Sequence, residues 1–124
     1  MTIQLTDREA DIMQALWDRG PSTVAEVRAQ LPDALAYTTV LTVLRILESK
    51  GYVNHIEEGR GHRYAAAVER QSARKSALRH LTDKLFEGSS ELLMTQLVTE
   101  QKLSPEQVKR LRKLLANRSN RETR

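Results

Sequence analysis

The chain has 124 residues, of which 40% are hydrophobic and only 4% aromatic, and its formal net charge is +4. This length suits one ordinary domain or a small domain with an appendage, and the scarcity of aromatic residues favours packing of aliphatic helices over a large β-sandwich. The absence of cysteine excludes disulfides and thiolate metal sites, and the chain has neither a long apolar run nor a signal-like N-terminus, so a cytoplasmic location is expected.

Two short helices are predicted in the first third of the chain. Thr6 can cap a helix whose third residue is Glu9, the reciprocal capping-box arrangement, and Gly20-Pro21 ends that helix. Residues 22–24 are too short for more than an extended segment or edge strand. A second helix is expected over residues 25–31, because its apolar residues recur at helical spacing before Pro32.

The segment from Tyr37 to Lys50 carries the strongest functional pattern. It predicts a helix that starts after Pro32-Asp33 with short polar residues as caps, and that ends at Lys50-Gly51. One face of this helix is apolar, and the opposite face bears hydroxyls and a guanidinium that suit base edges and phosphates. The apolar residues are Val40, Val43, Leu44 and Leu47, and the outward residues are Tyr37, Thr38, Thr39, Thr42, Arg45 and Ser49.

A β-hairpin is predicted directly after this helix. From Tyr52 to Ala66 the sequence alternates with a period of two around a turn at Glu58–Gly61. The order helix, extended piece, helix, turn, helix, hairpin is that of a winged helix-turn-helix, a mainly α fold with a small β-wing. We expect its core to contain Leu16, Trp17, Val27, Leu31, Val40, Leu44, Leu47 and Ile56.

Three amphipathic helices are expected in the remaining part of the chain. The first covers residues 68–86, the second starts at residues 89–91, and the third starts at Ser104-Pro105, whereas residues 117–124 are expected to be frayed. So many apolar stripes are hard to bury in a monomer, so we predict a winged-helix domain at residues 1–67 and a helical dimerisation tail at residues 68–124. The expected dimer contacts are Leu78, Leu81, Leu85, Leu92, Leu93, Leu97, Val108, Leu111 and Leu115.

The predicted partner is double-stranded DNA, although charge alone does not mark the N-terminal half. Residues 1–67 carry seven Lys and Arg against nine Asp and Glu, a balance of −2, and the remainder carries +6. Four of the seven basic residues nevertheless lie on the third helix and the hairpin, namely Arg45, Lys50, Arg60 and Arg63, whereas five of the nine acidic residues lie on earlier elements. Because the N-terminal half has a net negative charge, it remains an alternative that the winged helix binds proteins and not DNA. A ligand-sensing regulator is a further alternative.

The expected DNA contacts are Tyr37, Thr38, Thr39, Leu41, Thr42, Arg45, Arg60 and Arg63. The alternative for Thr38, Thr39, Thr42 and Arg45 is a solvated helix face without a partner, and three further residues have alternatives of their own. Leu41 either belongs to the core or touches a thymine methyl group, and Tyr37 either contacts a phosphate or packs. Arg63 either contacts the DNA backbone or pairs with Glu57 across the hairpin.

The histidines His55, His62 and His80 raise the question of a metal site. His55 and His62 can face one another across the wing, but two imidazoles without a nearby carboxylate or thiolate make a weak site. No nucleophile, metalloprotease or phosphate-loop pattern is visible, so neither an enzyme nor a cofactor is expected.

Four segments together resemble the BlaI/MecI/CopY family of penicillinase-type repressors. They are LTDREADIMQALW at residues 5–17, AYTTVLTVLRILESKGYV at 36–53, GRGHRYAA at 59–66 and SPEQVKRLRKLL at 104–115. The resemblance implies a dimeric winged-helix repressor that occludes a palindromic operator of antibiotic-response or metal-response genes, with the C-terminal helices forming the dimer. In the β-lactam branch it further implies a membrane sensor with a metalloprotease domain, whose signal leads to cleavage of the tail.

This sequence departs from the family pattern at two places. The C-terminal cysteine cluster of copper-responsive members is missing, which argues against copper sensing by thiolates. The place that corresponds to the cleaved Asn-Phe bond of staphylococcal members is about Gln96-Leu97, which keeps only the polar-then-apolar character.

Overall fold

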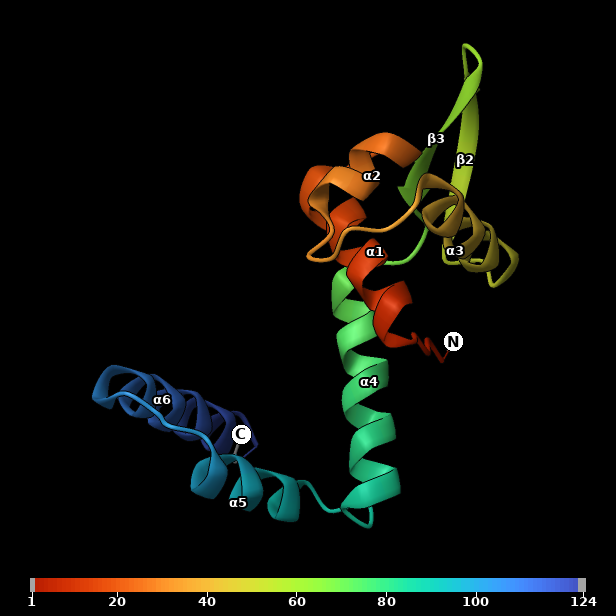
Figure 1. Ribbon diagram of the computed structural model, residues 1–124. Helices are drawn as coiled ribbons and strands as arrows, with labels where there is room; N and C mark the ends of the chain where they lie inside the picture. Colours follow the sequence, from red (N-terminus) through yellow and green to blue (C-terminus); the bar gives the residue numbers. More distant parts are fainter. Residues whose placement is uncertain (1, 123–124) are drawn as a thin grey trace. The chain divides into compact units, whose positions relative to one another are not determined.

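The structure, a computed structural model, describes residues 2–122 and divides into two compact units, Met1–His80 and Leu81–Arg124 (Figure 1). We call them the head unit and the tail unit. The long helix α4, Arg70–Leu85, runs from the first unit into the second. The units therefore divide inside α4, and not at residue 67.

The head unit has the element order of a winged helix-turn-helix, which confirms the predicted fold (Figure 1). The three strands form an antiparallel sheet in the order β1-β3-β2, so the short β1 lies beside the second strand of the hairpin. The elements before α4 are α1 (Asp7–Arg19), β1 (Ser22–Thr23), α2 (Val24–Gln30), α3 (Tyr37–Ser49), β2 (Val53–Glu58) and β3 (Gly61–Ala66).

Reciprocal capping boxes start the first two helices. Thr6 and Glu9 cap α1 as predicted, and Thr23 and Glu26 cap α2 in the same way, so α2 begins one residue earlier than expected. The polar cap predicted for α3 is wrong, because Ala36 precedes this helix and provides no side-chain hydrogen bond. The predicted end of α3 is confirmed, since Gly51 follows it with φ of +82°.

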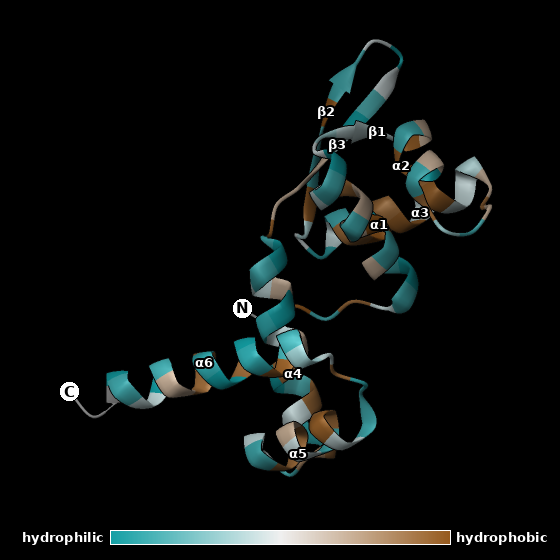
Figure 2. Ribbon diagram, turned by 90° about the vertical axis from the view of Figure 1, so that its left-hand side faces the viewer, coloured by the Kyte–Doolittle hydropathy of each residue, from teal (hydrophilic) through white to brown (hydrophobic). Residues whose placement is uncertain are grey.

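The core of the head unit lies between the three helices and the base of the hairpin. In Figure 2 brown, hydrophobic stretches of α1 and α3 lie next to one another there, while the tip of the hairpin is teal or pale. Trp17 and Leu31 are half-buried and pack against this core. The fully buried positions include Ile12, Met13, Val27, Val40, Leu44, Leu47 and Tyr64.

The prediction of Ile56 as a core residue is wrong. Ile56 is 66% exposed, whereas Val53 is only 2% exposed. The strand β2 begins at Val53, and Tyr52 is buried in the turn before it, so the inward face of the strand carries Val53 and His55. Because side chains alternate along a strand, Ile56 then points to the other face.

The tail unit contains the end of α4 and two further helices, α5 (Ser90–Glu100) and α6 (Pro105–Glu122). Ser89 caps α5, and Ser104 exchanges hydrogen bonds with Gln107 at the start of α6, as predicted. The frayed end expected from residue 117 is wrong up to Glu122, because the polar residues there contain no helix breaker and α6 continues through them. Residues 123 and 124 lie outside the described part.

Among residues 2–122, no helix combines the length and the apolar character that crossing a bilayer requires.

Candidate nucleic-acid interface

The third helix presents one fully buried face and one exposed polar face. Val40, Leu44 and Leu47 each have 0% exposure, so this side of α3 is fixed against the core. The structure brings the predicted outward residues together on the opposite side. The exposed residues there are Tyr37, Thr38, Thr39, Thr42, Arg45 and Ser49.

Details of this face refine the sequence prediction. The Thr42 hydroxyl donates to the carbonyl oxygen of Thr38 at 2.9 Å, so the hydrogen of this hydroxyl is already used within α3. Leu41 is half-buried and packs against the core, as one of its two alternatives expected. Ile46 is 44% exposed, so an apolar side chain also reaches the surface of this helix.

The wing places its two arginines in different environments. Arg60 lies exposed at the tip, in the turn that Gly59 enters with φ of +62°. Arg63 is half-buried, and its guanidinium donates to Glu58 at 2.5 Å, to Glu26 at 3.2 Å and to a backbone carbonyl oxygen. The alternative of a pairing with Glu57 is wrong, because β2 and β3 pair in a register that sets Glu57 opposite His62.

The acidic side chains of the head unit are largely engaged by basic ones. Glu26 has a pKa lowered to about 2, because the Thr23 backbone N–H and the Arg19 guanidinium donate to its carboxylate although partial desolvation opposes the shift. Within residues 2–122, Arg45 and Arg60 form no ion pair with a carboxylate. In the described part of the head unit, the ion pairs between carboxylates and Lys or Arg join Asp11 and Asp33 to Arg8, Asp18 to Arg70, Glu26 to Arg19 and Arg63, Glu58 to Arg63, and Glu9 to Lys50.

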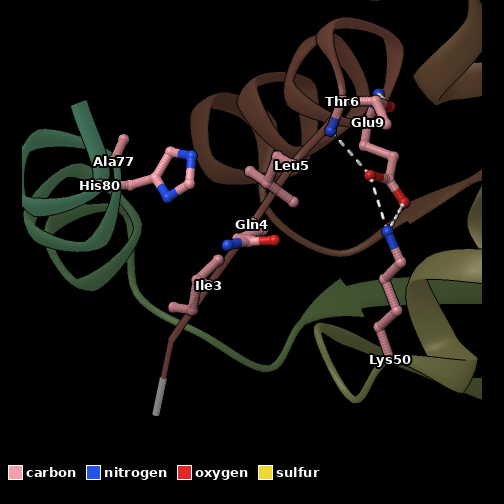
Figure 3. Close-up of a pocket in the computed structure, with 8 residues that line it drawn as sticks. All are labelled: Ile3, Gln4, Leu5, Thr6, Glu9, Lys50, Ala77 and His80. Carbon is pink, nitrogen blue, oxygen red and sulfur yellow. Dashed lines mark hydrogen bonds and ion pairs between the residues drawn. The ribbon is translucent and has the colours of Figure 1, made fainter. Parts of the chain in front are cut away.

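A cavity of about 370 Å³ lies beside the N-terminal segment of the head unit (Figure 3). Its principal charged groups are Glu9, which is 4% exposed, and Lys50, whose Nζ donates to both carboxylate oxygens at 3.0 and 2.7 Å. Since these two charges neutralise one another, the cavity offers a ligand mainly Gln4, His80 and apolar side chains. The arrangement serves to tie the first turn of α1 to the end of α3.

Two imidazoles stack on the wing, as predicted for His55 and His62. Their ring centroids lie 4.4 Å apart, and His55 Nδ1 lies 2.5 Å from a carboxylate oxygen of Glu48 on α3. Residues 2–122 contain no cluster of three histidine or carboxylate side chains suited to a metal ion. The network therefore connects the wing to α3 through hydrogen bonds and stacking.

Most of the predicted dimer contacts are exposed in the single chain. Leu85 and Leu115 are 73% and 59% exposed, and Val108 is half-buried. Leu93 is only 8% exposed, which places it inside its own unit and away from the expected partner surface. The other exposed members of the set are Leu78, Leu81, Leu92, Leu97 and Leu111.

Comparisons with known proteins agree with this geometry. A transcriptional regulator BlaI of Mycobacterium tuberculosis is 33% identical over 114 residues, which cover 76% of this chain and 83% of the relative. The penicillinase repressor of Bacillus licheniformis is 23% identical over 120 residues, covering 95% and 94%. The solution structure of monomeric Bacillus licheniformis BlaI in complex with the blaP half-operator has a TM-score of 0.50 and 27% identity, and covers 58% of this chain and 90% of that chain.

The family model for the penicillinase repressor matches residues 5–117, nearly the whole chain. Its members are transcriptional repressors and not enzymes, in keeping with the prediction that this chain is not an enzyme. The family match and the winged helix-turn-helix with an exposed polar α3 together show that the chain belongs to the penicillinase repressor family of DNA-binding transcriptional regulators.

Proposed function

We propose that the chain acts in the cytoplasm as a homodimeric repressor that occludes a palindromic operator. The observation that carries the proposal is the two-sided character of α3, whose inner residues are wholly buried while its threonines and Arg45 are exposed. A helix held in this way can enter the major groove, where Arg45 reaches guanine or phosphate and the threonines meet thymine methyl groups or the backbone.

The wing supplies the second set of contacts in this proposal. Arg60 at the tip of the hairpin is exposed and reaches the DNA backbone beside α3. Arg63 is occupied by Glu58 and Glu26, and we assign it to holding the hairpin against α2. The relative from Bacillus licheniformis in complex with a half-operator supports the same use of the winged-helix unit here.

The leucines exposed on the tail helices support dimerisation. Leu85, Leu92 and Leu115 would each stay in contact with water in a monomer, so a second copy of the chain that covers them gains apolar burial. Two recognition helices held by such a dimer would contact half-sites about one duplex turn, roughly 34 Å, apart. This spacing matches a palindromic operator.

Release by proteolysis is part of the proposal for this family member. The candidate bond Gln96-Leu97 lies in the middle of α5, and the Leu97 side chain is 45% exposed. Because a protease binds its substrate in an extended form, α5 must unwind locally before cleavage. The partner in this step would belong to a pathway that starts at a membrane sensor metalloprotease.

Selection of binding sites from a pool of random duplexes tests the proposal. The full chain is expected to enrich a palindromic sequence and to bind it at least about a thousandfold more tightly than a scrambled duplex. Equal and weak binding to both duplexes would favour the alternative of a protein-interaction module. A binding change caused by small molecules alone would favour a ligand-sensing regulator.

A further inference from the structure

Ionisable side chains of α3 and the wing gather around the imidazole of His55 and the phenol of Tyr64. His55 contacts Glu48 of α3 and the rings of His62 and Tyr64, and the charges of Glu48, Arg45 and Tyr37 act on Tyr64. Glu57, also on β2, lies on the same face of the hairpin opposite His62. All of them belong to the head unit.

The phenol of Tyr64 joins this group to the candidate DNA-binding arginine. Tyr64 is 1% exposed, and its ring lies 5.3 Å from that of His55 between centroids. Burial raises the pKa of Tyr64 and the charge of Glu48 adds to the rise, whereas the positive charge of Arg45 opposes it. Arg45 and Glu48 of α3 therefore both lie close enough to this buried phenol to act on its ionisation.

Glu48 is placed to compete with DNA for Arg45. The two residues are three apart on one helix, a spacing that brings side chains together on the same face. An ionised Glu48 attracts the guanidinium of Arg45 and repels phosphates that approach it. A cation that binds Glu48 from the other side removes both effects.

The imidazole of His55 can be that cation. Its Nδ1 already lies 2.5 Å from Glu48, and imidazoles change charge between about pH 5 and 8. Of the two stacked imidazoles, that of His55 lies against a carboxylate, and two positive rings 4.4 Å apart would repel one another. The imidazole beside Glu48 is therefore the one through which a positive charge would act on this carboxylate.

We propose that His55 is a proton-linked positioning residue for DNA binding, which in its protonated form holds Glu48 and frees Arg45 for the operator. The inference rests on the proposed function and adds a regulation of the same site. Because linkage is reciprocal, a proton that strengthens operator binding is itself bound more tightly when the operator is bound. Affinity for the operator is then expected to rise as pH falls through the range in which His55 titrates.

The test measures the affinity of the full chain for its selected palindromic duplex from pH 8 to pH 6 at constant ionic strength. The natural chain should gain about fivefold or more in affinity for the duplex over this pH range. A factor of about five is the lower end of the usual coupling between two binding sites. H55Q should lose this gain and keep the weaker affinity at every pH. H80Q, which removes the third histidine, is the matched control and should keep the full gain.

A second variant separates positioning from simple stability. E48Q removes the competing charge, so it should bind with the stronger affinity at every pH. Weaker binding by E48Q at both ends of the range, or an unchanged pH profile in H55Q, would overturn the proposal. Absence of a preference for any duplex at every pH would overturn the DNA-binding function itself.

Nuclear magnetic resonance supplies a readout that does not depend on affinity. The titration midpoint of the His55 ring should move to higher pH when the operator is added, and that of the His80 ring should not. Equal midpoints for His55 in the free and bound chain would overturn the proton linkage while leaving DNA binding intact.

Discussion

Glu9 and Lys50 form a bidentate contact that joins the first turn of α1 to the residue after α3, and the Glu9 side chain is almost completely buried. Burial opposes its ionisation, but hydrogen bonds from Lys50 and from the Thr6 backbone lower the pKa of Glu9 below its usual value. The pair thereby fixes the end of the candidate recognition helix relative to the helix that supports it.

Lys50→Met is expected to destabilise the chain by about 1–3 kcal/mol at pH 7, because it leaves a buried carboxylate short of a partner. The pKa of Glu9 is lowered in the folded chain, so its ionisation stabilises the fold above pH 4.5, the ordinary value, and this contribution disappears as pH falls through the folded value. The difference in free energy of unfolding between the natural chain and the Lys50→Met variant should therefore shrink below pH 4.5. Urea unfolding at pH 7 and pH 4 measures this difference, and Lys113→Met on α6 is the control. Equal losses of stability at both pH values would contradict a stabilising contact between Lys50 and the ionised Glu9.

Glu26→Gln tests the corresponding contact beneath the wing. The pKa of Glu26 is about 2 in the folded chain, so its stabilising effect is present above pH 4.5 and is lost as pH falls from 4.5 to about 2. The variant is expected to have a lower melting temperature at pH 7 and a flatter dependence of that temperature on pH below 4.5. Circular dichroism measures both, and Glu69→Gln, at an exposed position before α4, should leave them unchanged.

These contacts show what the sequence reveals and what it leaves open. The spacing of Val40, Leu44 and Leu47 predicts the buried face of α3, and Gly51 predicts its end, because both signals are local. The Thr23–Glu26 box of α2 was equally readable and was missed.

Other features depend on contacts distant in the sequence. The alternation in β2 identifies two faces, but with Tyr52 and Val53 both apolar only the packing against α3 decides which face is inside, and this is why Ile56 was misplaced. The partners of Arg63 include Glu26, which lies 37 residues earlier in the chain. No short-range pattern predicts such a pair.

Arg45→Ala is expected to weaken binding to the selected palindrome by about 1–3 kcal/mol, as loss of a bidentate base contact does. Binding to scrambled DNA should fall much less, because that complex lacks the base contact. Fluorescence anisotropy on both duplexes measures the difference, with Arg112→Ala on α6 as the matched control. Equal losses on both duplexes would reassign Arg45 to a phosphate contact.

Arg60→Ala should act differently, because a side chain at the tip of the wing reaches the DNA backbone. Its loss is expected to weaken binding to palindromic and scrambled duplexes alike. It should also reduce the slope of log K against log salt concentration by about 0.9 for each protomer, the value for one phosphate contact. Titrations at several salt concentrations measure the slope, and an unchanged slope would remove Arg60 from the interface.

Leu115→Glu tests the dimer surface of the tail unit. Because Leu115 is 59% exposed in the single chain, the substitution leaves the fold of one chain intact, but it places a charge where a second copy is expected to cover the leucine. Sedimentation should show a monomer at concentrations where the natural chain is a dimer, and affinity for the palindrome should fall because the two recognition helices no longer bind together. Arg112→Glu, a charged-to-charged change on the same helix, is the control for altered net charge. An unchanged sedimentation coefficient, or a natural chain that stays monomeric at high concentration, would remove α6 from the proposed interface.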